Sequence, residues 1–384
     1  MSDENAYDVI IIGAGPAGST LAYELASRSL SVCLIEKEKL PRYKPCGGGL
    51  TPKTIQLLPF DISELIEDEV HSVTISYNFQ KEFTKSSVKP LTFMVMRDRF
   101  DYFLVQKAVE KGAELREEAK VEKISQTNGG VDVVLSDKRT LKCAILVGAD
   151  GALGLTARTA GLEKNFYYGV ALEAEIPIDN EQAKKYKGDM SFILGSLDEG
   201  YGWIFPKKNH LSVGFGGTTK NGNRLHGLYK KLLSWKNLSE SGKLSGHPLK
   251  FRLNNEDEIV KDRIILIGEA AGLVDYLGGE GIYYAIWSAQ LAAPVIEKAI
   301  KKGIELLTEY QEEINREIMP DLLMSKRIAD IFYAHPWLVF QIFKRSKKTS
   351  DFLFGILTGE KKYRDLKKYA DRVQLLTSWL GKKI

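Results

Sequence analysis

The sequence has few of the residues that cross-link chains or bind metals. Three cysteines in 384 residues are too few for a disulfide framework, and their odd number favours a reducing compartment. The five histidines do not have metal-ligand spacing, so we expect no metal site; they are His71, His210, His226, His247 and His335. No stretch approaches the roughly 20 apolar residues that a membrane-spanning helix needs.

The start of the chain also lacks the basic segment of a secretory signal, because Asp3 and Glu4 stand in its place. We therefore expect a cytoplasmic protein, with peripheral attachment to the inner membrane face as an open alternative. The net charge of +4 is unevenly distributed, since residues 326–384 carry 14 Lys and Arg against five Asp and Glu. This basic segment suits a lipid surface or an acidic redox protein, and we expect no nucleic-acid partner.

The chain is rich in glycine at its beginning, where residues 7–36 read as strand, turn, helix and strand. Residues 7–12 form a continuous apolar run, as expected for a parallel strand covered on both faces. Residues 13–18, Gly-Ala-Gly-Pro-Ala-Gly, follow at once and precede a helical pattern. The next apolar run, residues 31–35, ends on Glu36. This order predicts a Rossmann-type dinucleotide-binding domain.

Each position of this motif has a physical task, and the residue there is suited to it. Gly13 allows the tight turn, Gly15 leaves space for a pyrophosphate, and Gly18 allows close packing of the helix on the strand. The helix N-terminus offers free N–H groups to the phosphates. Glu36 can accept hydrogen bonds from the adenosine ribose. The motif alone does not distinguish FAD from NAD.

Three later segments resemble flavoproteins of the para-hydroxybenzoate hydroxylase type. They are residues 93–101 (Phe-Met-Val-Met-Arg-Asp-Arg-Phe-Asp), 145–151 (Ile-Leu-Val-Gly-Ala-Asp-Gly) and 263–272 (Arg-Ile-Ile-Leu-Ile-Gly-Glu-Ala-Ala-Gly). The resemblance implies that the cofactor is FAD. It implies that Arg97 contacts the flavin nucleotide, with a solvated helix start as the alternative. It also implies that Glu269, where the family has aspartate, binds the ribitol.

A glycine-rich segment, residues 278–282, then opens an apolar helix that we expect to run through Ala299. Its N–H groups and positive helix end suit the pyrimidine edge of a reduced flavin. Together these segments give the expected FAD-binding residues, which are Gly13, Gly15, Pro16, Ala17, Gly18, Glu36, Lys37, Cys46, Gly47, Arg97, Asp150, Gly268, Glu269, Gly279, Gly281 and Ile282.

Three motifs resemble the geranylgeranyl reductase family in particular. They are Tyr-Lys-Pro-Cys-Gly-Gly-Gly-Leu at 43–50, Gly-Tyr-Gly-Trp-Ile-Phe-Pro at 200–206, and Gly-Glu-Gly-Ile at 279–282. The resemblance covers about residues 7 to 300. The chain departs from the family at Glu269 and at Asp275-Tyr276, where a proline-containing turn is common.

The expected fold is α/β, with a Rossmann-type FAD-binding domain, an inserted antiparallel substrate sheet and a C-terminal helical region. We divide the chain into 1–165 and 258–302 for the FAD-binding domain, 166–257 for the substrate domain, and 303–384 for the helical region. Within the substrate domain we expect strands at 170–176, 190–194, 202–205 and 211–215. Strands at 73–79 and 91–95 are expected to join the same sheet.

The resemblance implies saturation of isolated C=C bonds in a geranylgeranyl or other prenyl chain of a lipid, quinone or pigment precursor. Reduced flavin would deliver hydride from N5 to one carbon, and a proton would reach the other. Cys46 is the candidate proton donor; the alternative is a small residue packed beside the flavin. Tyr201, Trp203 and Phe205 alternate, so a regular strand puts them on one face, either as a tunnel wall for substrate or as ordinary core.

Two other functions remain open from the sequence. One is an FAD-dependent monooxygenase of the aromatic hydroxylase type, and the other is a non-enzymatic flavin electron-transfer module. The electron donor is NAD(P)H, bound transiently, or reduced ferredoxin. The apolar and basic segment from His335 to Lys348 can lie on anionic lipid, or it can pack its apolar face on the body and leave its lysines in solvent.

Overall fold

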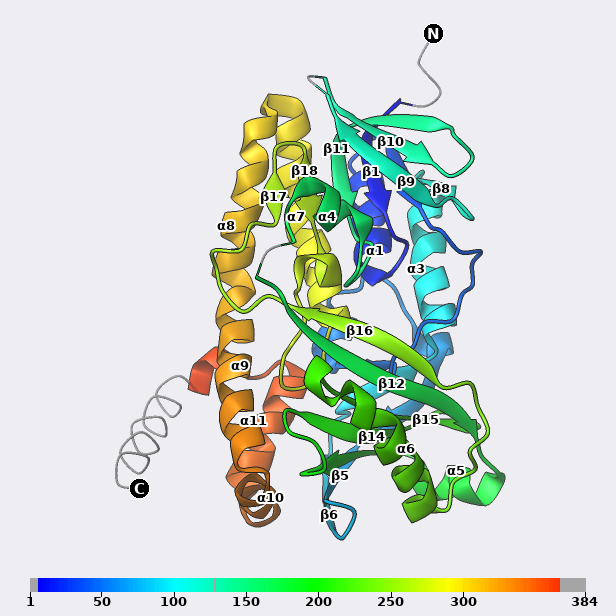
Figure 1. Cartoon of the computed structure of the whole chain (residues 1–384), viewed down its shortest axis with the longest axis vertical. Helices are drawn as coiled ribbons and strands as arrows, with labels where there is room; N and C mark the ends of the chain where they lie inside the picture. The colour runs from blue at the N-terminus through cyan, green and yellow to red at the C-terminus, as the bar shows by residue number, and fades with distance from the viewer. Residues whose placement is uncertain (1–5, 128, 164, 367–384) are drawn as a thin grey trace.

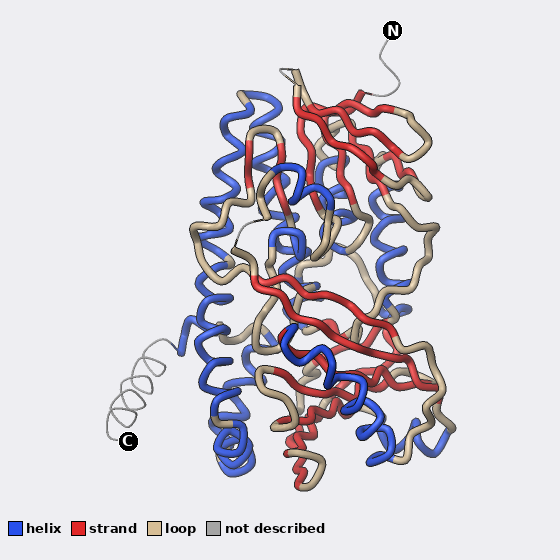
Figure 2. Tube along the Cα trace, viewed as in Figure 1, coloured by secondary structure: helices blue, strands red, loops and turns tan. Residues whose placement is uncertain are grey.

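The computed structural model describes residues 6–127, 129–163 and 165–366. Figure 1 shows two sheet regions one above the other, with a long pair of helices running along one side of both. Figure 2 shows strands in both regions and helices against each of them. None of the helices within the described residues is long and apolar enough to cross a bilayer. The last part of the basic C-terminal segment, 367–384, lies outside the described residues.

The upper region is a Rossmann-type sheet of eight strands. Its main path is β17 (Val260–Lys261), β18 (Ile264–Leu266), β11 (Thr140–Gly148), β1 (Ala6–Ile12), β2 (Val32–Ile35) and β8 (Glu114–Arg116), and β11 also pairs with β10 (Val131–Leu135), which pairs with β9 (Val121–Gln126). The pairs of β1 with β11 and β2 are parallel. Residues 9–12 are therefore covered on both faces, which explains their unbroken apolar run. Cys33 and Cys143 are buried in β2 and β11, as expected.

Helix α1 (Pro16–Ala26) packs between α3 (Arg97–Glu110) and α7 (Ile282–Lys302). Gly18 allows α1 to lie close to the end of β1, because a Cβ there would lie 1.9 Å from the carbonyl oxygen of Gly13 and 3.2 Å from the Ile11 side chain. The expected helix after residue 281 is confirmed and extends to Lys302. The shorter helices are α2 (Pro52–Gln56), α4 (Leu155–Ala160) and α5 (Asn180–Tyr186).

The lower region is a seven-stranded sheet. Its order is β16 (Ser245–Phe251), β12 (Tyr167–Pro177), β15 (His210–Thr218), β14 (Gly200–Pro206), β13 (Asp189–Leu194), β5 (Ser72–Tyr77) and β6 (Lys81–Ser86). All neighbours are antiparallel except β13 and β5, which run parallel, so the sheet is mixed. The segment at 73–79 joins it, as expected. Helix α6 (Gly222–Lys236) covers its outer face with buried leucines and Tyr229.

The expectation that 91–95 joins this sheet is wrong. Strand β7 (Thr92–Val95) instead pairs with β3 (Gly49–Leu50) and β4 (Ile66–Val70) in a separate three-stranded sheet. The reason is that the loop of residues 43–50, called the glycine-rich loop below, returns along β7, where Val95 N–H donates to the Gly48 carbonyl at 2.8 Å. This small sheet fixes the end of that loop between the two larger sheets.

The described C-terminal part is helical, as expected. It comprises α8 (Thr308–Glu317), α9 (Met319–Ala334), α10 (Pro336–Arg345) and α11 (Lys347–Thr358). Helices α8 and α9 run past both sheet regions, and α10 and α11 fold back beside the lower sheet (Figure 1). Phe340 of α10 is fully buried against Tyr77 and Phe83. The inner face of the C-terminal region therefore closes the open face of the lower sheet.

Candidate functional site

A single continuous cavity of ≈ 1130 Å³ lies between the two sheet regions. It runs from the end of β2, past the glycine-rich loop, to the inner face of α9–α11. Of the expected site residues, all line this cavity except Gly18 and Gly268. A Cβ on Gly268 would lie 2.8 Å from that of Ala17. Gly268 and Gly18 therefore allow close packing next to the cavity, and their contact with the cofactor stays a prediction.

One end of the cavity fits a dinucleotide. A Cβ on Gly13 would lie 2.4 Å from the Ala149 carbonyl oxygen, and Gly13 has φ +104, so the turn requires glycine. Gly15 faces open space, with only an Arg42 nitrogen at 4.0 Å. No side chain caps the N-terminus of α1, so its N–H groups are free for a pyrophosphate.

Glu36 is 4% exposed and its carboxylate is held in place. It accepts hydrogen bonds from Ala14 N–H at 3.3 Å and from Arg42 Nε at 3.0 Å. Arg42 also reaches Asp101 at 3.1 Å, and Asp101 makes two 2.8 Å bonds to Arg97. This chain of ion pairs connects the nucleotide end of the cavity with the glycine-rich loop.

Arg97 is buried at the start of α3, so the solvated alternative is wrong for this residue. Burial alone would lower the pKa of Arg97, but the carboxylate of Asp101 outweighs it, and the Cys46 thiol adds a further hydrogen bond. Asp101 is 0% exposed. The buried pair leaves the guanidinium charged beside the sulfur of Cys46.

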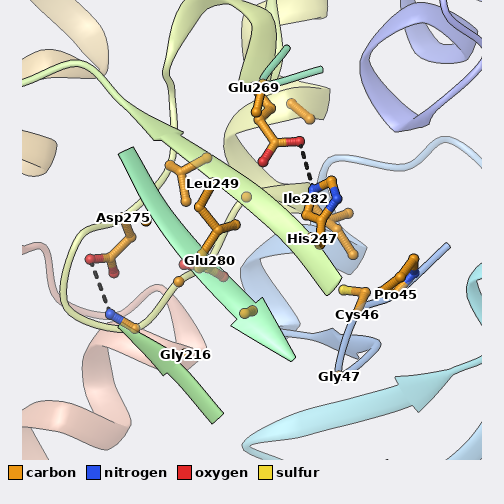
Figure 3. A pocket seen from close by; sticks show the side chains of 18 of the residues that line it. Pro45, Cys46, Gly47, Gly216, His247, Leu249, Glu269, Asp275, Glu280 and Ile282 are labelled. Atoms are coloured by element: carbon orange, nitrogen blue, oxygen red, sulfur yellow. Dashed lines mark hydrogen bonds and ion pairs between the residues drawn. The ribbon is translucent and has the colours of Figure 1, made fainter. Parts of the chain in front are cut away.

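Glu269 occupies the position of the family aspartate and contacts two basic side chains. Its carboxylate lies 3.5 Å from Lys44 Nζ and 3.3 Å from His247 Nε2, and the second contact is drawn in Figure 3. Burial would raise the pKa of Glu269, but Lys44 and His247 lower it to about 2. The acid is therefore ionised and set between the glycine-rich loop and β16.

Asp150 lines the cavity but already has protein partners. Its carboxylate accepts 2.9 Å hydrogen bonds from both the N–H and the hydroxyl of Thr156, at the start of α4. Burial raises its pKa. The structure thus gives Asp150 a role in capping α4, and its contact with the cofactor stays a prediction.

Cys46 is half-buried in the glycine-rich loop, whose backbone is hydrogen-bonded to the side chains of Glu173 and Lys207. Its N–H donates to Glu173 at 2.7 Å, and its sulfur accepts from Gly48 N–H at 3.4 Å. Lys207 is 3% exposed and donates to the carbonyls of Gly47 at 2.9 Å and Val95 at 2.6 Å. Burial lowers the pKa of Lys207 and raises that of Glu173.

The three aromatic residues of β14 share one face of the sheet and line the cavity. Ring centroids of Trp203 lie 6.3 Å from both Tyr201 and Phe205. The opposite strand provides the space, since a Cβ on Gly214 would lie 2.4 Å from the Trp203 indole. The Tyr201 hydroxyl donates to the Gly278 carbonyl at 2.5 Å, which ties this wall to the glycine-rich segment before α7.

The residues just before that segment are hydrogen-bonded to the C-terminal region. Asp275 is 1% exposed and accepts hydrogen bonds from the hydroxyls of Ser325 and Tyr363, the latter at 2.7 Å. Tyr333 donates to the Leu277 carbonyl at 3.1 Å. Gly279, Gly281 and Ile282 line the cavity just beyond. Figure 3 places Asp275 and Cys46 on opposite sides of the view.

The far end of the cavity is apolar. Side chains of the lower sheet and of the C-terminal helices face one another there, including Val73, Ile75, Phe192, Phe343, Phe354 and Leu357. The nucleotide end, by contrast, contains Glu36, Lys37 and Glu38. The cavity is therefore suited to a polar cofactor at one end and a hydrocarbon at the other.

Sequence reasoning missed several residues that build this site. Arg42 and Lys44 stand in the sequence next to Cys46, so a cationic loop was visible there. Glu173 and Lys207 are charged residues within or beside apolar strands, which is an indication of buried function. The sequence did not indicate that α10 and α11 line the cavity, because residues of a protein core and of a substrate tunnel are both apolar.

The fold and site define an FAD-dependent oxidoreductase, and the comparisons agree. The chain belongs to the FAD binding domain family, which matches residues 6–319. It is 37% identical over 340 residues to an uncharacterized protein of Methanosarcina barkeri, covering 88% of this chain and 86% of the relative. FAD is therefore the cofactor, and the free N–H groups at α1 and the open space at Gly15 fit it.

The resemblance to geranylgeranyl reductases is confirmed by named relatives. The chloroplastic geranylgeranyl diphosphate reductase of Oryza sativa is 29% identical over 355 residues, with 85% of this chain and 75% of the relative covered. The digeranylgeranylglycerophospholipid reductase of Methanococcus vannielii is 27% identical over 333 residues, with 80% and 82% covered.

Solved structures share the fold. A geranylgeranyl bacteriochlorophyll reductase-like protein of Thermoplasma acidophilum has a TM-score of 0.74 at 24% identity, covering 95% of this chain and 94% of the other. The flavin-dependent brominase Bmp2 has a TM-score of 0.75 at 21% identity, covering 96% and 99%. Because both reductase-like and brominase structures match equally well, the fold does not choose the reaction.

Proposed function

We propose that this protein reduces isolated C=C bonds in the prenyl chain of a lipid, quinone or pigment precursor. The observation that carries the proposal is the continuous cavity, which leads from the FAD site along the Trp203 wall into an apolar end closed by α10 and α11. An aromatic hydroxylase needs a pocket of ring size, whereas this space suits a long hydrocarbon. The named relatives support the same substrate class.

The reduced flavin, when bound, supplies the hydride for one alkene carbon. The chain's own part is to hold the alkene against the wall, exclude water and provide a proton for the other carbon. The Cys46 thiol is the candidate donor, because it lines the cavity. Gly48 N–H and the Arg97 guanidinium adjoin its sulfur, and both would stabilise the negative charge left there.

We propose in addition that α10 rests on an anionic bilayer from which the prenyl chain enters. Trp337, Leu338 and Ile342 are 40%, 56% and 43% exposed, while Phe343 of the same helix lines the cavity. Exposed cations accompany this strip: Lys81 lies over the Trp337 ring at 4.9 Å, and Lys344, Arg345, Lys347 and Lys348 follow closely in the chain. An exposed apolar strip with a basic rim is complementary to anionic lipid.

The test is product analysis under anaerobic conditions. The FAD-loaded protein, reduced with dithionite, is incubated with a digeranylgeranyl glycerolipid, and the lipid is examined by mass spectrometry. Addition of one H₂ per double bond supports the reductase. Turnover that requires oxygen and inserts an oxygen atom would identify a monooxygenase instead. A flavin that is reduced and reoxidised by redox proteins, with no lipid product, would identify an electron-transfer module.

A further inference from the structure

A buried carboxylate beneath the glycine-rich loop connects two parts of the site. Glu173 lies on β12, is 2% exposed, and faces the cavity. It accepts hydrogen bonds from the Tyr43 hydroxyl, from Cys46 N–H at 2.7 Å and from the Ser212 hydroxyl at 3.2 Å. The donors come from the loop on one side and from β15 on the other.

The contact to Ser212 extends to the substrate wall. The Trp203 indole N–H donates to the Ser212 oxygen at 3.2 Å. A single carboxylate therefore holds the Cys46 backbone directly and the Trp203 ring through one hydroxyl. The loop backbone on either side of these contacts is held by Lys207, through the carbonyls of Gly47 and Val95.

A charged group at this buried position lowers the stability of the folded state. Removing a carboxylate from water costs several kcal/mol even after relaxation, and apolar residues at such sites are often as stable or more so. The residues in register with Glu173 on the neighbouring strands are Gly214 and, beyond it, Trp203, and neither is ionisable. Stability alone therefore does not explain an acid with three donors aimed at it, and a role in the site does.

We propose that Glu173 is a positioning residue that fixes Cys46 relative to Trp203. It sets the separation between the thiol and the wall against which the alkene lies. The geometric part stands on the contacts alone, whereas its effect on turnover rests on the proposed function. The two parts are therefore measured separately.

The variants are Glu173→Gln and Glu173→Ala, with Glu175→Gln as the matched control. Glutamine keeps the shape but its amide nitrogen cannot accept a hydrogen bond, so Tyr43 or Cys46 loses its acceptor. Glu175 is a half-buried acid two residues along the same strand, and its carboxylate lies 3.3 Å from His210 Nε2. Within the described part of the chain, the hydrogen bonds of Tyr43, Cys46 N–H and Ser212 go to Glu173 and not to Glu175.

The first readout does not depend on the substrate. Iodoacetamide is allowed to react with the FAD-loaded protein, and labelled peptides are counted by mass spectrometry. Cys33 and Cys143 are 0% and 4% exposed, so they report unfolding, and Cys46 reports the loop. We expect Cys46 to react faster in Glu173→Gln, and faster again in Glu173→Ala, while Glu175→Gln reacts like the parent.

The second readout is turnover. We expect kcat to fall by roughly 10-fold to 100-fold in Glu173→Ala, as for a small misplacement of a reacting group, with KM and FAD content retained. Glu173→Gln should lie between this variant and the parent. Unchanged Cys46 labelling in both Glu173 variants would overturn the proposal. If the parent itself shows no prenyl turnover, the proposed function fails, and the labelling result still decides the role of Glu173.

Discussion

Burial and pairing act in opposite directions on the acids around the cavity. At Glu269 the charge of Lys44 and the hydrogen bond from His247 outweigh burial and lower the pKa to about 2. At Glu175 burial dominates, the charge of Glu173 adds to it, and the pKa rises to about 7 despite Lys207. Near neutral pH the first acid is therefore ionised, and the second exchanges a proton.

The raised pKa of Glu175 predicts a pH-dependent loss of stability. Between its ordinary pKa of 4.5 and about 7, the carboxyl ionises in the unfolded chain but stays protonated in the fold. The folded state then binds more protons, so stability falls as pH rises, by at most about 3 kcal/mol. We expect Glu175→Gln to gain stability relative to the parent across this interval. Denaturant midpoints at several pH values measure it, and parallel curves for the two proteins would refute it.

Cys46→Ala separates a chemical role of the thiol from packing. The alanine is smaller and keeps the backbone contact with Glu173, so FAD binding should be retained. If the thiol delivers the proton, reoxidation of the reduced flavin by prenyl substrate should slow by roughly 10²-fold or more, while flavin reduction changes little. Rapid anaerobic kinetics measure both steps. Equal reoxidation rates in variant and parent, with reoxidation limiting, would leave Cys46 a packing residue.

Trp203→Ala tests the wall. Trp203 is 8% exposed, so its truncation costs stability in any case, on the order of 3–5 kcal/mol. If its ring also guides the hydrocarbon, the variant should reduce different double bonds or a different number of them. Mass spectrometry of the products, with a thermal melt for comparison, separates the two effects. A lowered melting temperature with an unaltered product pattern would show that Trp203 is an ordinary core residue and does not guide the substrate.

At the scale of elements, α10 packs on the body, which is one of the two outcomes left open by the sequence, and leaves part of its apolar surface exposed. One face packs on the body through Phe340, which stacks on Trp337 at 5.5 Å. The other face exposes Leu338 and Ile342 beside the basic residues after it. The same helix therefore belongs to the cavity wall and to the surface, which is where a lipid-borne substrate would have to pass.

This arrangement predicts binding to anionic vesicles. Replacing Lys344, Arg345, Lys347 and Lys348 by glutamine should weaken co-sedimentation with phosphatidylglycerol vesicles, since each basic residue near such a surface contributes about 1 kcal/mol. The matched control replaces Lys120, Lys123, Lys138 and Arg139 of the upper region. Equal binding of the two variants, or none by the parent, would contradict the proposal. Retained activity on short water-soluble prenyl substrates would show that the first variant is folded.

At the scale of the whole molecule, the glycine motif and the flavoprotein segments were sufficient to predict the FAD-binding fold. They succeed because tight turns and phosphate approach leave few residue choices at Gly13 and Gly15. The prediction that β7 joins the substrate sheet was wrong, because the sequence of a short apolar strand does not indicate which strand it pairs with. The hydrogen bonds of Glu173 to Tyr43 and Cys46 and the ion pair of Arg42 with Asp101 could also not be predicted, because these contacts join residues far apart in the chain.

The most direct measurement is a single turnover without oxygen. Protein loaded with FAD and reduced stoichiometrically is mixed with a digeranylgeranyl glycerolipid in detergent, and flavin absorbance is followed while lipid is sampled for mass. Because the cavity joins the flavin site to an apolar end, we expect reoxidation of the flavin to match the formation of lipid with one added H₂ per flavin. A flavin that stays reduced until oxygen is admitted, with no change in the lipid, would contradict prenyl reduction by this protein.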